Sequence, residues 1–285
     1  MRTDWRVVVV GLMLPVLGTS AVVARAAAPE GSDSEKRPRR AGRAVLGGDA
    51  LGKVREVLAS ADSDAVVTAL GGLADSGASN AALPIVELLA VGPPPPATIA
   101  ALDALKKLRD PTSVELLNLY AGHRSAEVRK HAVQALGVFA DARVVPTLME
   151  RLGDSAPDVR AVAAEALATR GEKAAVPRLM ALLKRNDAGA AAPLGALAPV
   201  SALSSIVALQ GSIDDDNLAA ALGELLKRRD APESVRVELV KALGLVPGAS
   251  STTALVEYVA ESSGGDRRAS RIEAQKVIDE RSKSR

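Results

Sequence analysis

The chain has 285 residues, of which 48% are apolar and only 1% aromatic. Ala, Leu and Val supply most of this apolar content, which is enough for a sizeable core and favours close packing of helices through small side chains. The formal net charge is +2, and the absence of cysteine excludes disulfides, thiolate metal sites and cysteine nucleophiles.

Residues 1–26 are predicted to be a secretory signal peptide. Two arginines among the first six residues precede an almost wholly apolar run over 7–23, and Ala-Arg-Ala at 24–26 fits a cleavage site. An uncleaved membrane anchor is the alternative, and Pro15 within the run argues against it. We expect an exported bacterial protein, periplasmic or secreted, with no stable membrane insertion after cleavage.

Cleavage would change the charge of the protein. Residues 1–26 contain three arginines and one aspartate, so their removal would leave a formally neutral chain. A neutral chain is a poor general binder of nucleic acid. We therefore expect no nucleic-acid partner.

Residues 27–48 are predicted to form a flexible basic linker. They are rich in Pro, Gly and Ser, show no apolar periodicity and carry Lys-Arg-Pro-Arg-Arg at 36–40. A docking tail is the alternative interpretation of this basic run. The stretch 47–53 matches most of a phosphate-binding loop, but Val54 replaces the Ser or Thr that would hold magnesium, so we expect no nucleotide site.

Internal repetition dominates residues 49–263, which are predicted to form one repeat domain. The apolar pattern of 126–137 recurs 31 positions later and again near 233–244, and Val-Pro-x-Leu at 145–148 recurs at 176–179. The apolar spacings are helical, so each repeat predicts a pair of helices. First helices are expected near 64–75, 96–108, 125–138, 156–170, 200–210 and 233–246, and second helices near 80–91, 112–121, 143–153, 174–185, 216–229 and 251–262.

Three segments fall outside this regular pattern. A helix near 49–60 is expected to cap the N-terminal end of the repeats. The fifth repeat is longer than the others, and the Ala-, Gly- and Pro-rich stretch 187–199 is expected to absorb the excess. The charged residues 264–285 are expected to form a C-terminal tail, either a frayed helix or a disordered segment.

The sequence x-Val-Arg-x-x-Ala-x-x-Ala-Leu-Gly, followed by Val-Pro-x-Leu-x-x-x-Leu, resembles the HEAT-like repeats of the phycobilisome lyase family over roughly residues 60–262. The first, second and fifth repeats depart from this pattern because they lack the Val-Arg pair. The resemblance implies an all-α fold, an α-α superhelix of the HEAT-like or armadillo-like solenoid class with about five to six helical pairs. It implies no single function, since such repeats serve many unrelated proteins.

Several polar residues have structural interpretations. Arg129, Arg160 and Arg236 share one repeat position, and the resemblance implies that each bonds to loop carbonyls or to an acidic residue of the next repeat; an external binding stripe is the alternative. Asp154, Asp158, Asp230 and the run Asp214–Asn217 are expected to cap helices or compensate their dipoles. Neither histidine has metal-ligand spacing, and we expect no catalytic, cofactor or metal site.

The resemblance implies that the second helices line a concave face. Candidate partner-binding residues on these helices share repeat positions and form a mixed-charge ridge: Tyr120, Glu150, Arg151, Arg178, Lys184, Glu224, Lys227, Glu257 and Tyr258. Dipole compensation is the alternative role of the cations. We expect a scaffold or adaptor that binds a protein or peptide and is not an enzyme; an accessory subunit of an enzyme or of a chromophore-lyase-like assembly is the alternative.

Overall fold

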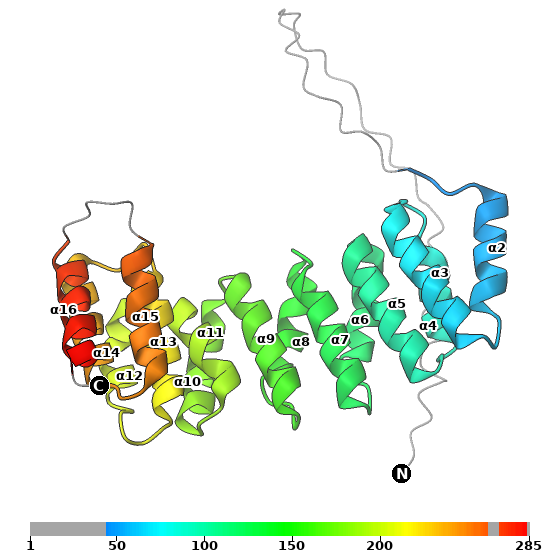
Figure 1. Ribbon diagram of the computed structural model, residues 1–285. Coiled ribbons are helices and arrows are strands. Elements are labelled where there is room, and N and C mark those ends of the chain that lie inside the picture. Colours follow the sequence, from blue (N-terminus) through cyan, green and yellow to red (C-terminus); the bar gives the residue numbers. More distant parts are fainter. Residues whose placement is uncertain (1–43, 262–267, 284–285) are drawn as a thin grey trace, which may run out of the picture. The chain divides into compact units, whose positions relative to one another are not determined.

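The computed structural model describes residues 44–261 and 268–283, and all regular elements within these ranges are helical (Figure 1). The predicted signal peptide and residues 27–43 of the predicted linker lie outside the described residues. The chain divides into two compact units, with the boundary between Asp110 and Pro111. No helix in the described part of the chain is long and apolar enough to cross a lipid bilayer.

The first unit contains α2 (Gly48–Leu58), α3 (Ser63–Ser76), α4 (Ala82–Ala90) and α5 (Pro95–Leu108). Helix α3 lies beside α5, while α2 contacts α3 and α4. Asp62 begins α3 by accepting the N–H groups of residues 64 and 65, and Gly77 ends it at φ 57°. Pro95 begins α5, where its missing N–H costs no hydrogen bond.

The last residues of the predicted linker are ordered against the first unit. Residues 44–47 precede α2 without regular structure, and the carbonyl of Ala44 accepts the N–H of Ser79 at 2.9 Å. The Asn80 side chain accepts from Leu46 N–H and donates to Leu46 O, both at 3.0 Å. The linker predicted to reach residue 48 is therefore already fixed from residue 44.

The second unit contains α6 (Val114–Tyr120), α7 (Ala126–Gly137), α8 (Val145–Arg151), α9 (Pro157–Thr169), α10 (Val176–Lys184), α11 (Ala191–Leu197), α12 (Leu203–Val207), α13 (Asp215–Lys227), α14 (Glu233–Leu245), α15 (Ala249–Ala260) and α16 (Ala269–Lys283). Short 3₁₀ turns precede several of them, including η3 (Lys173–Ala175) and η4 (Ala188–Ala190). The prediction of an all-α fold of paired helices is confirmed.

These helices form two layers (Figure 1). In the odd layer (α7, α9, α11, α13 and α15), each helix packs on the next member of the layer. In the even layer (α6, α8, α10, α12, α14 and α16), each helix from α6 to α14 packs on the odd-numbered helix that follows it. The repeat leucines at positions 117, 136, 148, 167 and 179 are fully buried, and each contributes about 2 kcal/mol relative to an exposed leucine.

Helix α11 corrects the prediction for the fifth repeat. The stretch 187–199 was expected only to absorb the excess length of that repeat, but it contains a helix that packs between α9 and α13. Because of this additional helix, the alternation of successive helices between the even and the odd layer is shifted by one helix after α11. As a result, α13 and α15 lie in the odd layer with the first helices of earlier repeats, whereas 216–229 and 251–262 were predicted to be second helices.

Small residues allow the odd layer to pack closely around α11. A Cβ on Gly195 would lie 2.2 Å from the carbonyl oxygen of Ala221 on α13, and a Cβ on Gly189 would lie 2.7 Å from the Ala161 Cβ on α9. Neither distance is sterically possible, so only glycine permits these helix separations. The glycines that give 187–199 its unusual composition are therefore required for the packing of this segment on α9 and α13.

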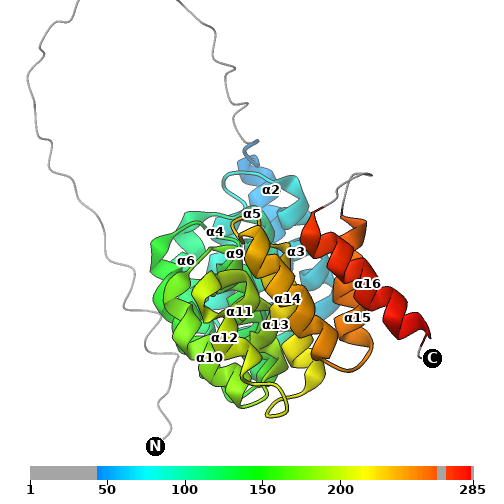
Figure 2. The same ribbon diagram turned by 90° about the vertical axis from the view of Figure 1, so that its left-hand side faces the viewer.

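Helix α16 occupies most of the segment expected to be a charged tail, and within residues 269–283 it is the helical alternative that is found. It lies against α14 and α15, as the end-on view in Figure 2 shows. Its inner side buries Ser270, Arg271 and Ala274, while Ile272 and most of its charged residues are exposed. The outer face of α16 is therefore mostly polar.

Candidate protein-interaction surfaces

Arg129 and Asp154 form a buried ion pair between consecutive repeats. The guanidinium donates to both carboxylate oxygens at 2.8 and 2.7 Å and to the carbonyl of His123 at 2.9 Å. The two side chains are 11% and 2% exposed. Burial alone would raise the pKa of Asp154, but hydrogen bonds from Arg129 and the Ala156 N–H, with the charges of Arg129 and Arg151, hold it below its usual value.

The equivalent arginines repeat this arrangement only in part. Arg160 bonds to Asp187 at 2.5 Å and to the Asp154 carbonyl at 2.9 Å, which makes a second ion pair of the same kind. Arg236 bonds to the carbonyl of Arg228, but its nearest carboxylate, Glu233, is 3.9 Å away. The structural interpretation of this repeat position is confirmed, with two complete ion pairs.

The aspartates near helix starts play different roles. Asp154 caps the turn before α9 by accepting from Ala156, and Asp158 lies exposed in the first turn of α9. Asp230 instead pairs with Arg228, and Asp214 makes no side-chain cap bond although it is the N-cap residue of α13. No group of three or more His, Asp or Glu among the described residues is placed to hold a metal ion.

Both tyrosines of the predicted ridge are buried. Tyr120 and Tyr258 are each 3% exposed, and burial raises the pKa of Tyr120 to about 12. The Tyr258 hydroxyl lies 2.7 Å from Ser270 Oγ, and the Arg271 guanidinium lies 4.9 Å from the centre of its ring. Neither tyrosine presents a surface to a partner, so the prediction of an exposed ridge containing them is corrected.

The other seven predicted residues fall into two clusters in different layers. Glu150, Arg151, Arg178 and Lys184 lie on α8 and α10 in the even layer, and Glu224, Lys227 and Glu257 lie on α13 and α15 in the odd layer. The single ridge expected from sequence does not exist. Its residues were aligned across 187–199, where α11 changes the layer of every later helix.

The odd-layer cluster is closed by its own ion pairs. Lys227 lies 3.0 Å from Glu224 and 3.1 Å from Glu257, so it joins α13 to α15. Burial lowers the pKa of Lys227, but the hydrogen bonds to the two carboxylates outweigh burial and raise it. A hollow of 260 Å³ beside this cluster has a floor of small residues, including Ala220 and Gly223.

The even-layer cluster borders an open groove between α8 and α10, here called the α8–α10 groove. Its volume is 540 Å³, and its lining residues are Pro146, Met149, Glu150, Leu152, Gly153, Arg178, Ala181, Leu182 and Arg185. Arg178 donates to the Met149 carbonyl at 2.5 Å, which holds its side chain across the groove. Glu150 pairs with Arg151 and is 70% exposed.

Sequence reasoning missed Met149 as part of this groove, whereas it noted Arg185 only through its pairing with Lys184. Lys184 and Arg185 recur as a pair at 227–228, and the pair was the available signal for Arg185. Met149 carries no such signal, because its position is defined only when α8 and α10 pack together.

Residues 113–198 match the HEAT repeats family. This segment is a HEAT-repeat array. It contains α6 to α11, and therefore both buried ion pairs and the α8–α10 groove.

No curated protein matches the chain. Among solved structures, the complex of CpcE and CpcF of phycocyanin lyase from Nostoc sp. PCC7120 is similar, with 19% identity and a TM-score of 0.45 over 87% of this chain and 99% of the other.

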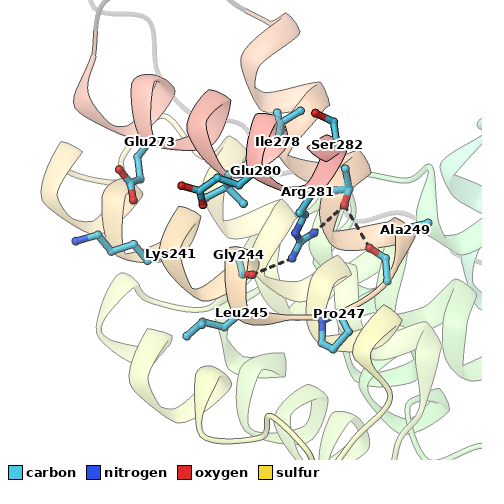
Figure 3. Close-up of a pocket in the computed structure, with 13 residues that line it drawn as sticks. Lys241, Gly244, Leu245, Pro247, Ala249, Glu273, Ile278, Glu280, Arg281 and Ser282 are labelled. Carbon is cyan, nitrogen blue, oxygen red and sulfur yellow. Dashed lines mark hydrogen bonds between the residues drawn. The ribbon is translucent and has the colours of Figure 1, made fainter. Parts of the chain in front are cut away.

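A cavity of the second unit lies beyond the matched HEAT array, among α14, α15 and α16 (Figure 3). Its volume is 800 Å³, and Arg281 projects into it from α16. Arg281 donates to the carbonyls of Leu243, Gly244 and Val246 and to the hydroxyls of Ser251 and Thr252. The cation at this site therefore satisfies the C-terminal carbonyls of α14, where positive charge is favoured.

Proposed function

We propose that this protein is an exported HEAT-repeat scaffold that binds another protein at the α8–α10 groove and has no catalytic role of its own. The observation that carries the proposal is the combination of an apolar floor with an unpaired cation, Arg185, in that groove and a second unpaired cation, Lys184, next to it in the sequence. The side chains of Lys184 and Arg185 make no hydrogen bond or ion pair with the described residues, and both residues are exposed. An exposed apolar hollow bordered by free arginine is typical of protein-binding surfaces.

Other charged groups in the second unit are less suited to recognition. Arg129 and Arg160 satisfy buried loops, and Lys227 is shared between two carboxylates. A partner at any of these places would first have to break existing ion pairs, which costs desolvation without compensation. The α8–α10 groove requires no such rearrangement.

The export part of the proposal rests on the pattern of residues 1–26. It is tested by fractionating the native cells and determining the N-terminus of the recovered protein by mass spectrometry. We expect the protein outside the cytoplasm, beginning at residue 27. A chain that stays in the cytoplasm with residues 1–26 attached would refute export without affecting the binding proposal.

The binding part is tested by site-specific photo-crosslinking. A photoreactive phenylalanine analogue replaces Ala181, which lines the groove, or Ala192, an exposed alanine on α11 in the other layer. In native cells we expect a discrete protein adduct from position 181 and none from position 192. The absence of an adduct at 181, or equal adducts at both positions, would refute the groove as the binding surface.

A further inference from the structure

We infer that the α8–α10 groove takes an acidic peptide segment that also carries a large apolar side chain. This inference rests on the proposed function and assigns the chemistry of the partner at the same site. It follows from three features of the groove: its uncompensated positive charge, the position of Arg178 on α10, and the aliphatic character of its floor.

The charge around the groove is positive and only partly neutralised. Arg178, Lys184 and Arg185 lie more than 4.0 Å from every carboxylate of the described residues, so none forms an ion pair. Glu150 is the acidic residue of the lining, and it already pairs with Arg151. A carboxylate brought to this surface would gain attraction without displacing an existing partner.

Helix dipoles do not explain all of these cations. Lys184 and Arg185 lie at the C-terminal end of α10, where positive charge is favoured in any helix. Arg178 lies in the first turn of the same helix, where the dipole disfavours a cation. Its bond to Met149 O uses one guanidinium nitrogen, which leaves other N–H groups available for a carboxylate.

The floor of the groove selects for an apolar side chain. Leu152 and Leu182 are buried, Met149 is half-buried, and Pro146 and Ala181 complete the aliphatic surface. Methionine adapts its shape to irregular ligands, so one groove can accept Leu, Met or Phe. No aromatic residue lines the groove, which gives nucleic-acid bases no stacking platform and favours a peptide as the anionic partner.

The inference is tested by selecting peptides from an unbiased display library of random 12-residue sequences on the purified protein. Enriched peptides are synthesised with a fluorescent label, and their affinities are measured by anisotropy. We expect enrichment of Asp and Glu together with at least one Leu, Met or Phe. We also expect the affinity to fall several-fold as salt rises from about 0.05 to about 0.5 M, because exposed charges are screened.

Three variants locate the binding site. The double variant Lys184→Glu/Arg185→Glu loses no hydrogen bond of the fold and should weaken binding at least about tenfold. Ala181→Trp fills the groove without changing its charge and should weaken binding to a similar extent. The control Arg229→Glu/Lys241→Glu changes the net charge equally at two exposed cations outside the groove and should leave affinity within about twofold.

Several outcomes would overturn the inference: no enriched peptides, peptides without acidic residues, or acidic peptides that bind the groove and control variants equally. Strong binding of a labelled single-stranded oligonucleotide at the same groove would assign the groove to nucleic acid instead.

The proposed function and this inference can fail independently of each other. A cellular protein that crosslinks at position 181 through an uncharged or basic segment keeps the function and refutes the acidic partner. Conversely, acidic peptides that bind the groove, without any protein adduct at position 181 in cells, would support the inferred chemistry of the groove and refute the proposed cellular function.

Discussion

Asp154 lies in the loop between α8 and α9, and its carboxylate is shared by several donors. Arg129 donates to both oxygens, Arg151 lies 3.5 Å away, and the Ala156 N–H completes the site. Because the side chain is 2% exposed, water cannot replace these interactions. Arg151 also pairs with Glu150, so Asp154 decides above all whether Arg129 is neutralised, and therefore whether the junction between two repeats is stable.

Replacing Asp154 by Asn should lower the free energy of unfolding by about 3 kcal/mol, because it leaves Arg129 with an uncompensated buried charge. The control is Asp158→Asn, which removes a 74% exposed carboxylate 3.5 Å from Lys130 and should change stability by about 0.5 kcal/mol or less. Urea unfolding followed by circular dichroism measures both. Equal effects of the two substitutions would contradict the buried-pair argument.

The pH dependence of stability should carry the signature of the same residue. Burial alone would raise the pKa of Asp154, but hydrogen bonds from Arg129 and Ala156 lower it, while an unfolded aspartate titrates near about pH 3.9. Between the folded and the unfolded pKa of Asp154, the unfolded chain therefore binds more protons than the folded chain. The stabilisation that Asp154 gives is present above about pH 4 and is lost as pH falls through the folded pKa. The stability difference between wild type and Asp154→Asn should be largest near about pH 6 and shrink in acid; a constant difference would refute this assignment.

At the scale of elements, the repeat pattern predicts most helices because buried leucines recur at helical spacing. Helix α9 was expected over 156–170 and is found at Pro157–Thr169. Helix α11 escaped prediction because its Ala-, Gly- and Pro-rich sequence has little apolar periodicity, although its side chains fill the space between α9 and α13. Spacing also does not say which layer a later helix joins, so the predicted ridge combined residues from both layers.

Gly195→Ala tests whether α11 is held by close backbone approach. Alanine favours helices over glycine, so an unconstrained site would gain stability. A Cβ at residue 195 would instead lie 2.2 Å from Ala221 O and 3.0 Å from Ala221 C, which are backbone atoms of α13. We expect a loss of about 1–3 kcal/mol in the free energy of unfolding, measured by urea denaturation.

The matched control is Gly71→Ala in α3, where nothing lies within 4 Å of the added Cβ. This substitution should stabilise its helix by up to about 1 kcal/mol. Opposite signs for the two substitutions would identify the α11–α13 contact as the cause. A stabilising effect of Gly195→Ala would mean that α13 does not approach α11 as closely as the structure shows.

At the scale of the whole second unit, the layers make stability a sum of contacts between neighbouring helices. Helix α16 has no further helix beyond it in the described chain, so it depends mainly on α14 and α15. Arg281 supplies much of this attachment because it bonds to three carbonyls near the α14 C-terminus and to two hydroxyls of α15. Loss of this side chain should loosen the end of the array and leave its middle intact.

Arg281→Ala is therefore expected to produce a local change in hydrogen exchange. Amides of α16 and of the last turn of α14 should lose protection by about 2 kcal/mol, since several hydrogen bonds to one charged group are removed. Amides of α7 and α9, which do not contact α16, should keep their protection. Lys276→Ala, an exposed cation on the same helix 4.0 Å from Glu280, serves as the control and should change little. A uniform loss of protection across the second unit would show that its helices unfold as one cooperative block, and that α16 is part of that block instead of a separately held end.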